Sequence, residues 1–147
     1  MHLAQLNVAR LLEPIDSPRL ASFVALLDEV NAAGDASPGF VWRLQSEGGN
    51  ATDIRPWGDD VIVNLTVWES VESLHSFVYA PAHVAVLRRR REWFAAMGSA
   101  HLVLWWVPEG HRPGLPEAGE RLARLTADGP TPDAFDLRTT YPASGAG

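Results

Sequence analysis

Residues 60–68 alternate between two classes of side chain more strictly than any other part of the chain. A period of two is typical of a β-strand, whose successive side chains point to opposite faces of a sheet. One face is entirely apolar and consists of Val61, Val63, Leu65 and Val67. The other face mixes polar and apolar side chains and consists of Ile62, Asn64, Thr66 and Trp68. The chain must therefore build a sheet whose two faces have different surroundings.

The rest of the chain supplies partners for this strand. Further strands are expected at 2–9, 40–45 and 101–107, and helices at 17–34, 70–80, 81–97 and 115–128. This order predicts an α+β, ferredoxin-like βαββαβ fold, in which one four-stranded antiparallel sheet carries helices on a single face, plus an extra C-terminal helix. With 147 residues, the chain fits one domain over 1–142, followed by a flexible tail at 143–147.

The parity of the strands predicts what each face meets. We expect the all-apolar face of 60–68 to lie under the helices. The opposite wall then holds Gln5, Asn7, Asn64, Thr66, Trp68 and the Trp42 or Arg43 face of the second strand. A wall that includes Ile62 and Trp68 is too apolar for bulk water, so a second copy of the sheet is expected to cover it. The sequence thus predicts a homodimer that encloses a partly polar cavity.

Composition excludes several classes of chemistry. The chain has no cysteine, which excludes thiolate catalysis and disulfides, and all 12 of its basic residues are arginine, which excludes Schiff-base lysines. A net charge of −6 argues against nucleic-acid binding. No segment is typical of a signal peptide, a membrane span or a metal site. A cytoplasmic protein that binds no membrane and no metal is the expectation.

Two passages carry a resemblance to a known family. The stretch from Val67-Trp68-Glu69-Ser70 to Ala80-Pro81-Ala82-His83 resembles the antibiotic-biosynthesis monooxygenase branch of the dimeric α/β-barrel superfamily. Segments 2–7, 40–44, 89–94 and 105–108 also resemble a bacterial branch known as a domain of unknown function. The resemblance implies a homodimeric barrel and a role in secondary metabolism. Its members include cofactor-independent monooxygenases, haem-degrading oxygenases, polyketide cyclases and plain ligand binders.

The same resemblance implies a haem alternative. The haem-degrading branch uses an Asn on the first strand, a Trp at the end of the third and a His on the following helix. Asn7 and Trp68 match the first two by position, and His83 or His75 matches the third. Haem, held by His83, is therefore the alternative to a site without a cofactor.

The expected catalytic residues are His83, Asn7 and Asn64. His83 lies in the first turn of its helix, where the positive end of the dipole favours the neutral imidazole, a possible base for a phenolic or α-carbonyl proton. Asn7 and Asn64 offer amides that hold a developing oxyanion. The alternatives are a structural histidine at a helix start, and amides that bond each other or water.

The expected substrate-binding residues are Arg43, Trp42, Trp68, Thr66, Gln5 and Trp105. Arg43 is able to clamp an anionic group, or to form a salt bridge with Glu69 or with an acid of a partner subunit. The tryptophans offer an aromatic slot, or fill a core or an interface. The sequence predicts an enzyme that binds an aromatic or polyketide-like molecule for monooxygenase-like, cyclase or isomerase chemistry. A non-catalytic ligand-binding module is the third possibility.

Overall fold

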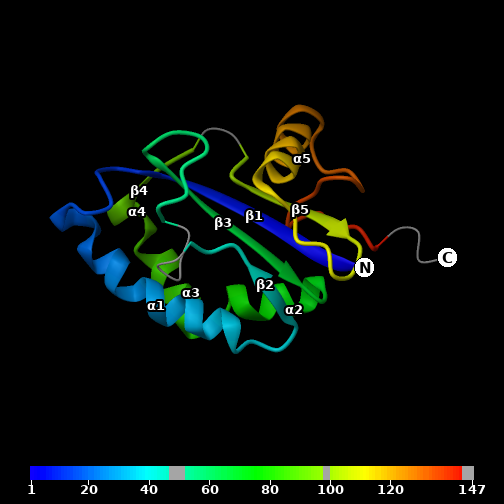
Figure 1. The fold of residues 1–147 in the computed structure, drawn as a ribbon, viewed down its shortest axis with the longest axis horizontal. Helices are drawn as coiled ribbons and strands as arrows, with labels where there is room; N and C mark the ends of the chain where they lie inside the picture. Colours follow the sequence, from blue (N-terminus) through cyan, green and yellow to red (C-terminus); the bar gives the residue numbers. More distant parts are fainter. Residues whose placement is uncertain (47–51, 98–99, 144–147) are drawn as a thin grey trace.

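The sheet is antiparallel and has β1 (His2–Leu11) near its centre. In the computed structural model, which describes residues 1–46, 52–97 and 100–143, β3 (Val61–Trp68) pairs with one edge of β1 and β2 (Phe40–Arg43) follows β3. The other edge of β1 pairs with β5 (Leu102–Val107) and the short β4 (Phe94–Ala95). The ferredoxin-like topology is therefore confirmed (Figure 1). The expected tail lies, except for Ala143, outside the described residues.

The chain contains η1 (Pro18–Leu20), α1 (Ala21–Asp35), α2 (Val71–Val78), α3 (Pro81–Arg88), α4 (Arg90–Trp93) and α5 (Leu115–Asp128). Four of the described helices, η1, α2, α3 and α5, begin with a proline in the first turn or at a capping serine. Ser70 caps α2 through a reciprocal pair of hydrogen bonds with Ser73. The helix expected up to residue 97 ends at Trp93, because Phe94 and Ala95 pair with Leu11 and Arg10 of a first strand longer than expected.

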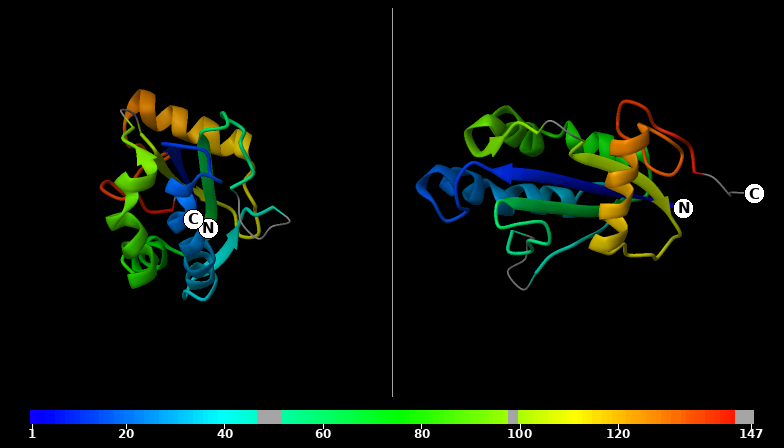
Figure 2. Two further views of the ribbon diagram at one scale, coloured as in Figure 1. Left: turned by 90° about the vertical axis from the view of Figure 1, so that its left-hand side faces the viewer. Right: turned by 90° about the horizontal axis from the view of Figure 1, so that it is seen from above.

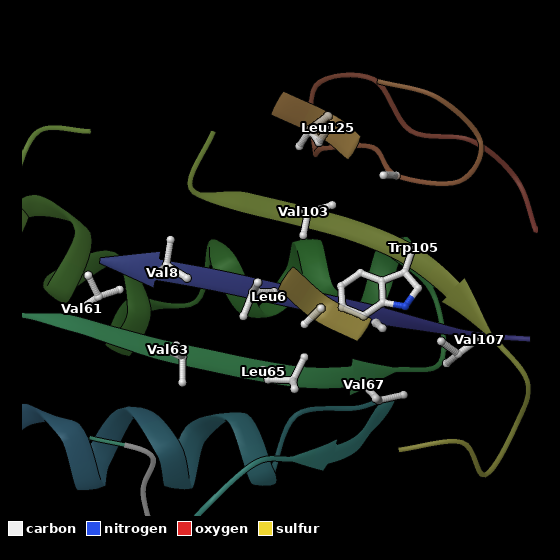
Figure 3. Packing of buried hydrophobic residues seen from close by; sticks show 13 residues of the cluster. Leu6, Val8, Val61, Val63, Leu65, Val67, Val103, Trp105, Val107 and Leu125 are labelled. Carbon is white, nitrogen blue, oxygen red and sulfur yellow. The ribbon is translucent and has the colours of Figure 1, made fainter. Parts of the chain in front are cut away.

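The all-apolar face of β3 lies under α5, not under the helices of the βαββαβ unit. Figure 3 shows Val61, Val63, Leu65 and Val67 on the same side of the sheet as Trp105, with α5 above them. Leu125 and Ala118 of α5 are buried in this cluster, and Trp42, Leu44 and Ile54 pack against it. The four β3 side chains are at most 7% exposed. This face, with its cover, is called the α5 face below.

The opposite face carries the other helices, which corrects the sequence expectation (Figure 2). At one end Trp68 packs with Leu74 of α2, and at the other Ile62 packs with Phe23 of α1 and Trp93 of α4. The physical reason is connectivity. β1–α1–β2 and β3–α2/α3–β5 each join parallel strands, and right-handed crossovers place both connections on the same side whichever face is more apolar. This is the helix face below.

The expected reason for a dimer does not hold in this architecture. Each face of the sheet packs against helices of its own chain, and the wall that includes Trp68 is covered by α2. The homodimer stays a prediction without that argument. Among the described residues, no helix is both long and apolar enough to cross a membrane.

Candidate functional site

Four polar side chains interrupt the helix face between its two apolar clusters. The register pairs Gln5 with Thr66 and Asn7 with Asn64, so the four form a compact block on the central strands. We call this block the central polar patch. Gln5 and Thr66 are buried, Asn7 is half-buried and Asn64 is exposed. Solvent therefore reaches the middle of a face whose two ends are closed by helices.

The central polar patch has a definite pattern of hydrogen bonds. The Gln5 Nε2 group lies 3.1 Å from the backbone oxygen of Asn64 and 3.5 Å from its Oδ1. The Trp68 indole N–H donates to Thr66 Oγ1 at 2.9 Å. Among the described residues, the side chain of Asn7 and the Nδ2 group of Asn64 make no hydrogen bond to protein. Asn7 and Asn64 therefore keep amide groups free for a ligand.

Trp68 closes one end of the helix face and is a core residue. Its indole stacks on Phe77 with ring centroids 5.3 Å apart, and meets the edge of Phe40 at 5.5 Å. It is 1% exposed. Neither face of the Trp68 indole is accessible, so the expected stacking of Trp68 on a substrate ring finds no support in this structure. Its polar contact with Thr66 is its link to the central polar patch.

His83 lies in the first turn of α3, on the same side of the sheet as the central polar patch. Its Nδ1 is 3.0 Å from the backbone oxygen of Val78, and its ring is 5.0 Å from that of Phe77. Burial lowers the pKa of His83 and outweighs the opposing effect of the Val78 carbonyl. The neutral ring donates its Nδ1 proton to that carbonyl and keeps the Nε2 lone pair. His83 makes no hydrogen bond to Asn7 or Asn64; its ring contacts Val78 and Phe77 instead.

Arg43 shares the helix face but has a partner in its own chain. It donates to Asp35, at the end of α1, through Nε at 2.8 Å and one terminal nitrogen at 3.2 Å. The guanidinium side chain is only 13% exposed. The salt-bridge alternative is therefore correct in kind, with Asp35 in place of Glu69. The expected role of Arg43 as a clamp for an anionic substrate finds no support in this geometry.

Trp42 and Trp105 lie on the α5 face and are not part of the same site, which corrects their assignment. Trp42 packs against the α5-face cluster, and Trp105 is fully buried in it. The indole N–H of Trp105 donates to Glu117 at 2.8 Å, and His111 lies 2.7 Å from the other carboxylate oxygen. Burial acts to raise the pKa of Glu117, but these two hydrogen bonds, together with charge interactions with His111 and Arg121, outweigh it and the net pKa is lowered.

The α5 face also contains a cavity of about 710 Å³ between α5 and the sheet. Val8, Met97, Leu115 and Leu122 are among its lining residues. Trp57 borders it, pressed so closely on α5 that a Cβ at Gly119 would lie 2.9 Å from the indole. No described lining residue is titratable, and the hydroxyl of Thr126 donates to the Leu122 carbonyl. The cavity has room for a ligand, but the lining residues that the structure describes offer no group for acid–base chemistry.

Sequence reasoning missed two residues that shape the helix face. Phe77 lies between Trp68 and His83, and Asp35 holds Arg43. The apolar stripe of 70–78 indicates that Phe77 is buried but not which rings it separates. The partner of Arg43 depends on where α1 ends relative to β2, which no local pattern contains.

A family model described as "Domain of unknown function (DUF3291)" matches residues 2–147. The solved structure of Rv0793 from Mycobacterium tuberculosis is similar over 76% of this chain and 100% of its own, with 14% identity and a TM-score of 0.53. A conserved protein from Methanosarcina mazei Go1 is similar over 74% and 94%, with 9% identity and a TM-score of 0.54. These likenesses support the fold alone.

A further similar structure is that of SnoaB, described as a cofactor-independent oxygenase from Streptomyces nogalater. It matches 79% of this chain and 98% of its own, with 18% identity and a TM-score of 0.49. No curated protein sequence matches the chain.

Proposed function

The chain belongs to the DUF3291 family, and from its central polar patch we propose that it is an enzyme acting on a small aromatic or polyketide-like molecule. The reaction begins with proton removal from a phenol or from a carbon next to a carbonyl. His83 takes the proton, and Asn7 and Asn64 hold the oxygen that becomes negative. The resulting phenolate or enolate then reacts through a carbon atom, with dioxygen in an oxygenase or with an internal carbonyl in a cyclase.

The exposure of Asn64 carries this proposal. The residue occupies the middle of a central strand, on a face where its neighbours two positions away, Ile62 and Thr66, are buried. An apolar side chain there would join the two apolar clusters. Asn7, its partner on β1, is also polar and half-buried. The donor group of Asn64 and the side chain of Asn7 have no hydrogen-bond partner among the described residues, so both are accessible to a ligand.

His83 suits the role of base for two reasons. The hydrogen bond to the Val78 carbonyl fixes which nitrogen carries the proton, so Nε2 is left as the acceptor. Burial keeps the ring neutral, because the pKa of His83 is lowered. A neutral imidazole with a defined acceptor nitrogen is the form that removes a proton.

The geometry does not fit the haem alternative. Phe77 separates Trp68 from His83, with ring centroids 5.3 Å and 5.0 Å away, respectively. No face of the Trp68 indole is open to a macrocycle. Titration with haemin, followed by its visible absorption, tests this. We expect no shift of the Soret band; a shift in the wild type that is lost in a His83→Ala variant would contradict this conclusion.

Exchange of a carbon-bound proton with solvent tests the proposed function for substrates that lose a proton next to a carbonyl, because oxygenase and cyclase chemistry on such substrates share that step; oxygen uptake tests the phenols. Aromatic 1,3-dicarbonyl compounds and polyphenols are incubated with the protein in D₂O and followed by NMR, with oxygen uptake measured in parallel. For a compound that exchanges, Asn64→Ala is expected to slow the step by about 100- to 1,000-fold. His83→Ala is expected to slow it by at least about 100-fold.

His75→Ala supplies the matched control, because His75 is exposed and contacts Tyr79 but no residue of the patch. It should leave exchange unchanged. Exchange that proceeds at full rate in both Asn64→Ala and His83→Ala rejects the proposed roles. Tight binding without exchange or turnover for every compound favours the non-catalytic binding module.

A further inference from the structure

Gln5 makes a two-point contact with Asn64 across adjacent strands. Its Nε2 group lies 3.1 Å from the backbone oxygen of Asn64 and 3.5 Å from the side-chain Oδ1. Gln5 is 5% exposed, so packing holds its side chain in place. The register makes this a diagonal neighbour contact, since Gln5 is opposite Thr66 and Asn64 is opposite Asn7.

The chemistry of this contact sets the direction of each amide. A backbone carbonyl only accepts hydrogen bonds, so the Gln5 group facing it must be the NH₂ and not the oxygen. The same NH₂ faces the Asn64 side chain, which therefore turns its oxygen toward Gln5. Its own NH₂, with no protein partner among the described residues, is left to the exposed side. Asn64 thus presents hydrogen-bond donors to whatever approaches the patch.

Thr66 is restricted in the same sense. The Trp68 indole N–H, which can only donate, uses a lone pair of Thr66 Oγ1 at 2.9 Å. The hydroxyl proton of Thr66 is then directed to another acceptor. Both polar residues of β3 in the patch therefore have an acceptor site occupied from within the protein and keep a donor.

We propose that Gln5 is a positioning residue that orients Asn64 as a hydrogen-bond donor, and that the central polar patch consequently selects ligands with an acceptor oxygen. Enolate, phenolate and ketone oxygens belong to this class. The statement that the ligand is a substrate rests on the proposed function. The orientation of Asn64 and the preference for an acceptor oxygen are independent of the proposed function.

The orientation is measurable without any ligand. In ¹⁵N-labelled protein, the side-chain NH₂ of Gln5 should exchange slowly with water, and that of Asn64 quickly. Gln5→Glu replaces the donor with an acceptor, so Asn64 should reverse and one of its NH protons should become protected. Gln5→Leu removes the partner and should leave Asn64 without protection. Slow exchange at Asn64 in the wild type, with the fold intact by circular dichroism, overturns the proposal.

The ligand preference is tested with two neutral probes of nearly equal shape. 2-Acetylnaphthalene offers a ketone oxygen, and 2-isopropenylnaphthalene has a CH₂ group in its place. The ratio of their dissociation constants should shift about tenfold against the ketone in Gln5→Glu, as expected for the loss of about one hydrogen bond. Both probes are uncharged, so the new carboxylate does not repel either. Failure of the wild type to bind the ketone more tightly than the variant counts against the proposal.

The two proposals fail in different ways. If proton exchange depends on Asn64 and His83 but the ratio of the two probes' dissociation constants does not change in Gln5→Glu, the proposed function is supported and the positioning role is rejected. If the Asn64 amide reverses and the ratio shifts but no compound shows proton exchange, the positioning role is supported and the proposed function is rejected.

Discussion

The two faces of the sheet are built from alternate residues of the same strands, yet they are completed differently. On the α5 face, β3 contributes four apolar side chains that are at most 7% exposed, and α5 covers them from the same chain. On the helix face, the apolar clusters stop short of each other and leave Asn7 and Asn64 accessible between them. The α5 face therefore contributes a continuous apolar core, whereas the helix face leaves amide groups accessible, and the proposed chemistry is assigned to them.

Neighbouring residues on β3 give the largest expected contrast. Leu65 is 1% exposed on the α5 face, and Leu65→Ala is expected to lower the free energy of unfolding by about 3 kcal/mol through lost burial and a residual cavity. Asn64→Ala should change it by less than about 0.5 kcal/mol, because the side chain is exposed. Urea unfolding followed by tryptophan fluorescence measures both. Equal costs would show that Asn64 is a structural residue and remove the contrast.

The two buried tryptophans on β3 and β5 sharpen the comparison. The indole N–H of Trp105 bonds the Glu117 carboxylate, whereas that of Trp68 bonds the Thr66 hydroxyl. Bonds to a charged acceptor contribute more, so Trp105→Phe should cost about 1 kcal/mol more than Trp68→Phe. Both variants replace an indole with the smaller phenyl ring, so each is the control for the other. A larger cost for Trp68→Phe in urea unfolding would reverse the ranking of the faces.

Joining the two apolar clusters of the helix face should separate stability from function. Asn64→Val places a β-branched apolar side chain between Ile62 and Trp68, and is expected to stabilise the protein by about 0.5 kcal/mol. The same change should abolish the preference for the ketone probe. Thermal unfolding and the two-probe titration report the two effects. A loss of stability above about 1 kcal/mol would mean that the amide supports the fold.

The smallest expected effect is a dependence of stability on pH at His83. Its pKa is lowered in the folded state by burial, so folding favours the neutral ring. The contribution of His83 to the free energy of unfolding is complete above the histidine pKa of the unfolded chain, about 6.5. It is lost as pH falls below that value, because the unfolded chain then binds a proton more readily than the folded chain. Between pH 7 and 5, wild type should lose more stability than His83→Gln.

The sequence predicted the elements better than it predicted their arrangement. Alternation located β3 within one residue, and the prolines and serines located the starts of α2 and α3. These signals are local, because they depend on the preferred backbone and exposure of a few consecutive residues. The end of the helix after α3 was wrong, since Phe94 and Ala95 pair with β1, more than eighty residues away in the chain.

The candidate site was predicted in part. Parity correctly grouped Gln5, Asn7, Asn64 and Thr66, because residues opposite each other on paired strands share a face. It left open whether Trp42 or Arg43 shares this face, and the register places Arg43 opposite Thr66 and Trp42 on the α5 face. Trp105, which was assigned to the site as an aromatic side chain, lies opposite Ala4 and also belongs to the α5 face. The cover of the two faces was a separate error: the more apolar face was assigned to the helices of the βαββαβ unit, although the final helix also had an apolar stripe to bury.

The sequence by itself determined that the sheet has one uniformly apolar face and one interrupted by amides, because the period of two in β3 is a property of consecutive residues. The tertiary structure alone decided which helices cover which face. The cover of each face depends on the handedness of the crossovers and on the face of the sheet against which α5 packs. Both are set by how distant segments of the chain pair and pack. The same contacts leave Asn64 open to solvent and place Gln5 beside it, which turns a pattern of residues into a possible site.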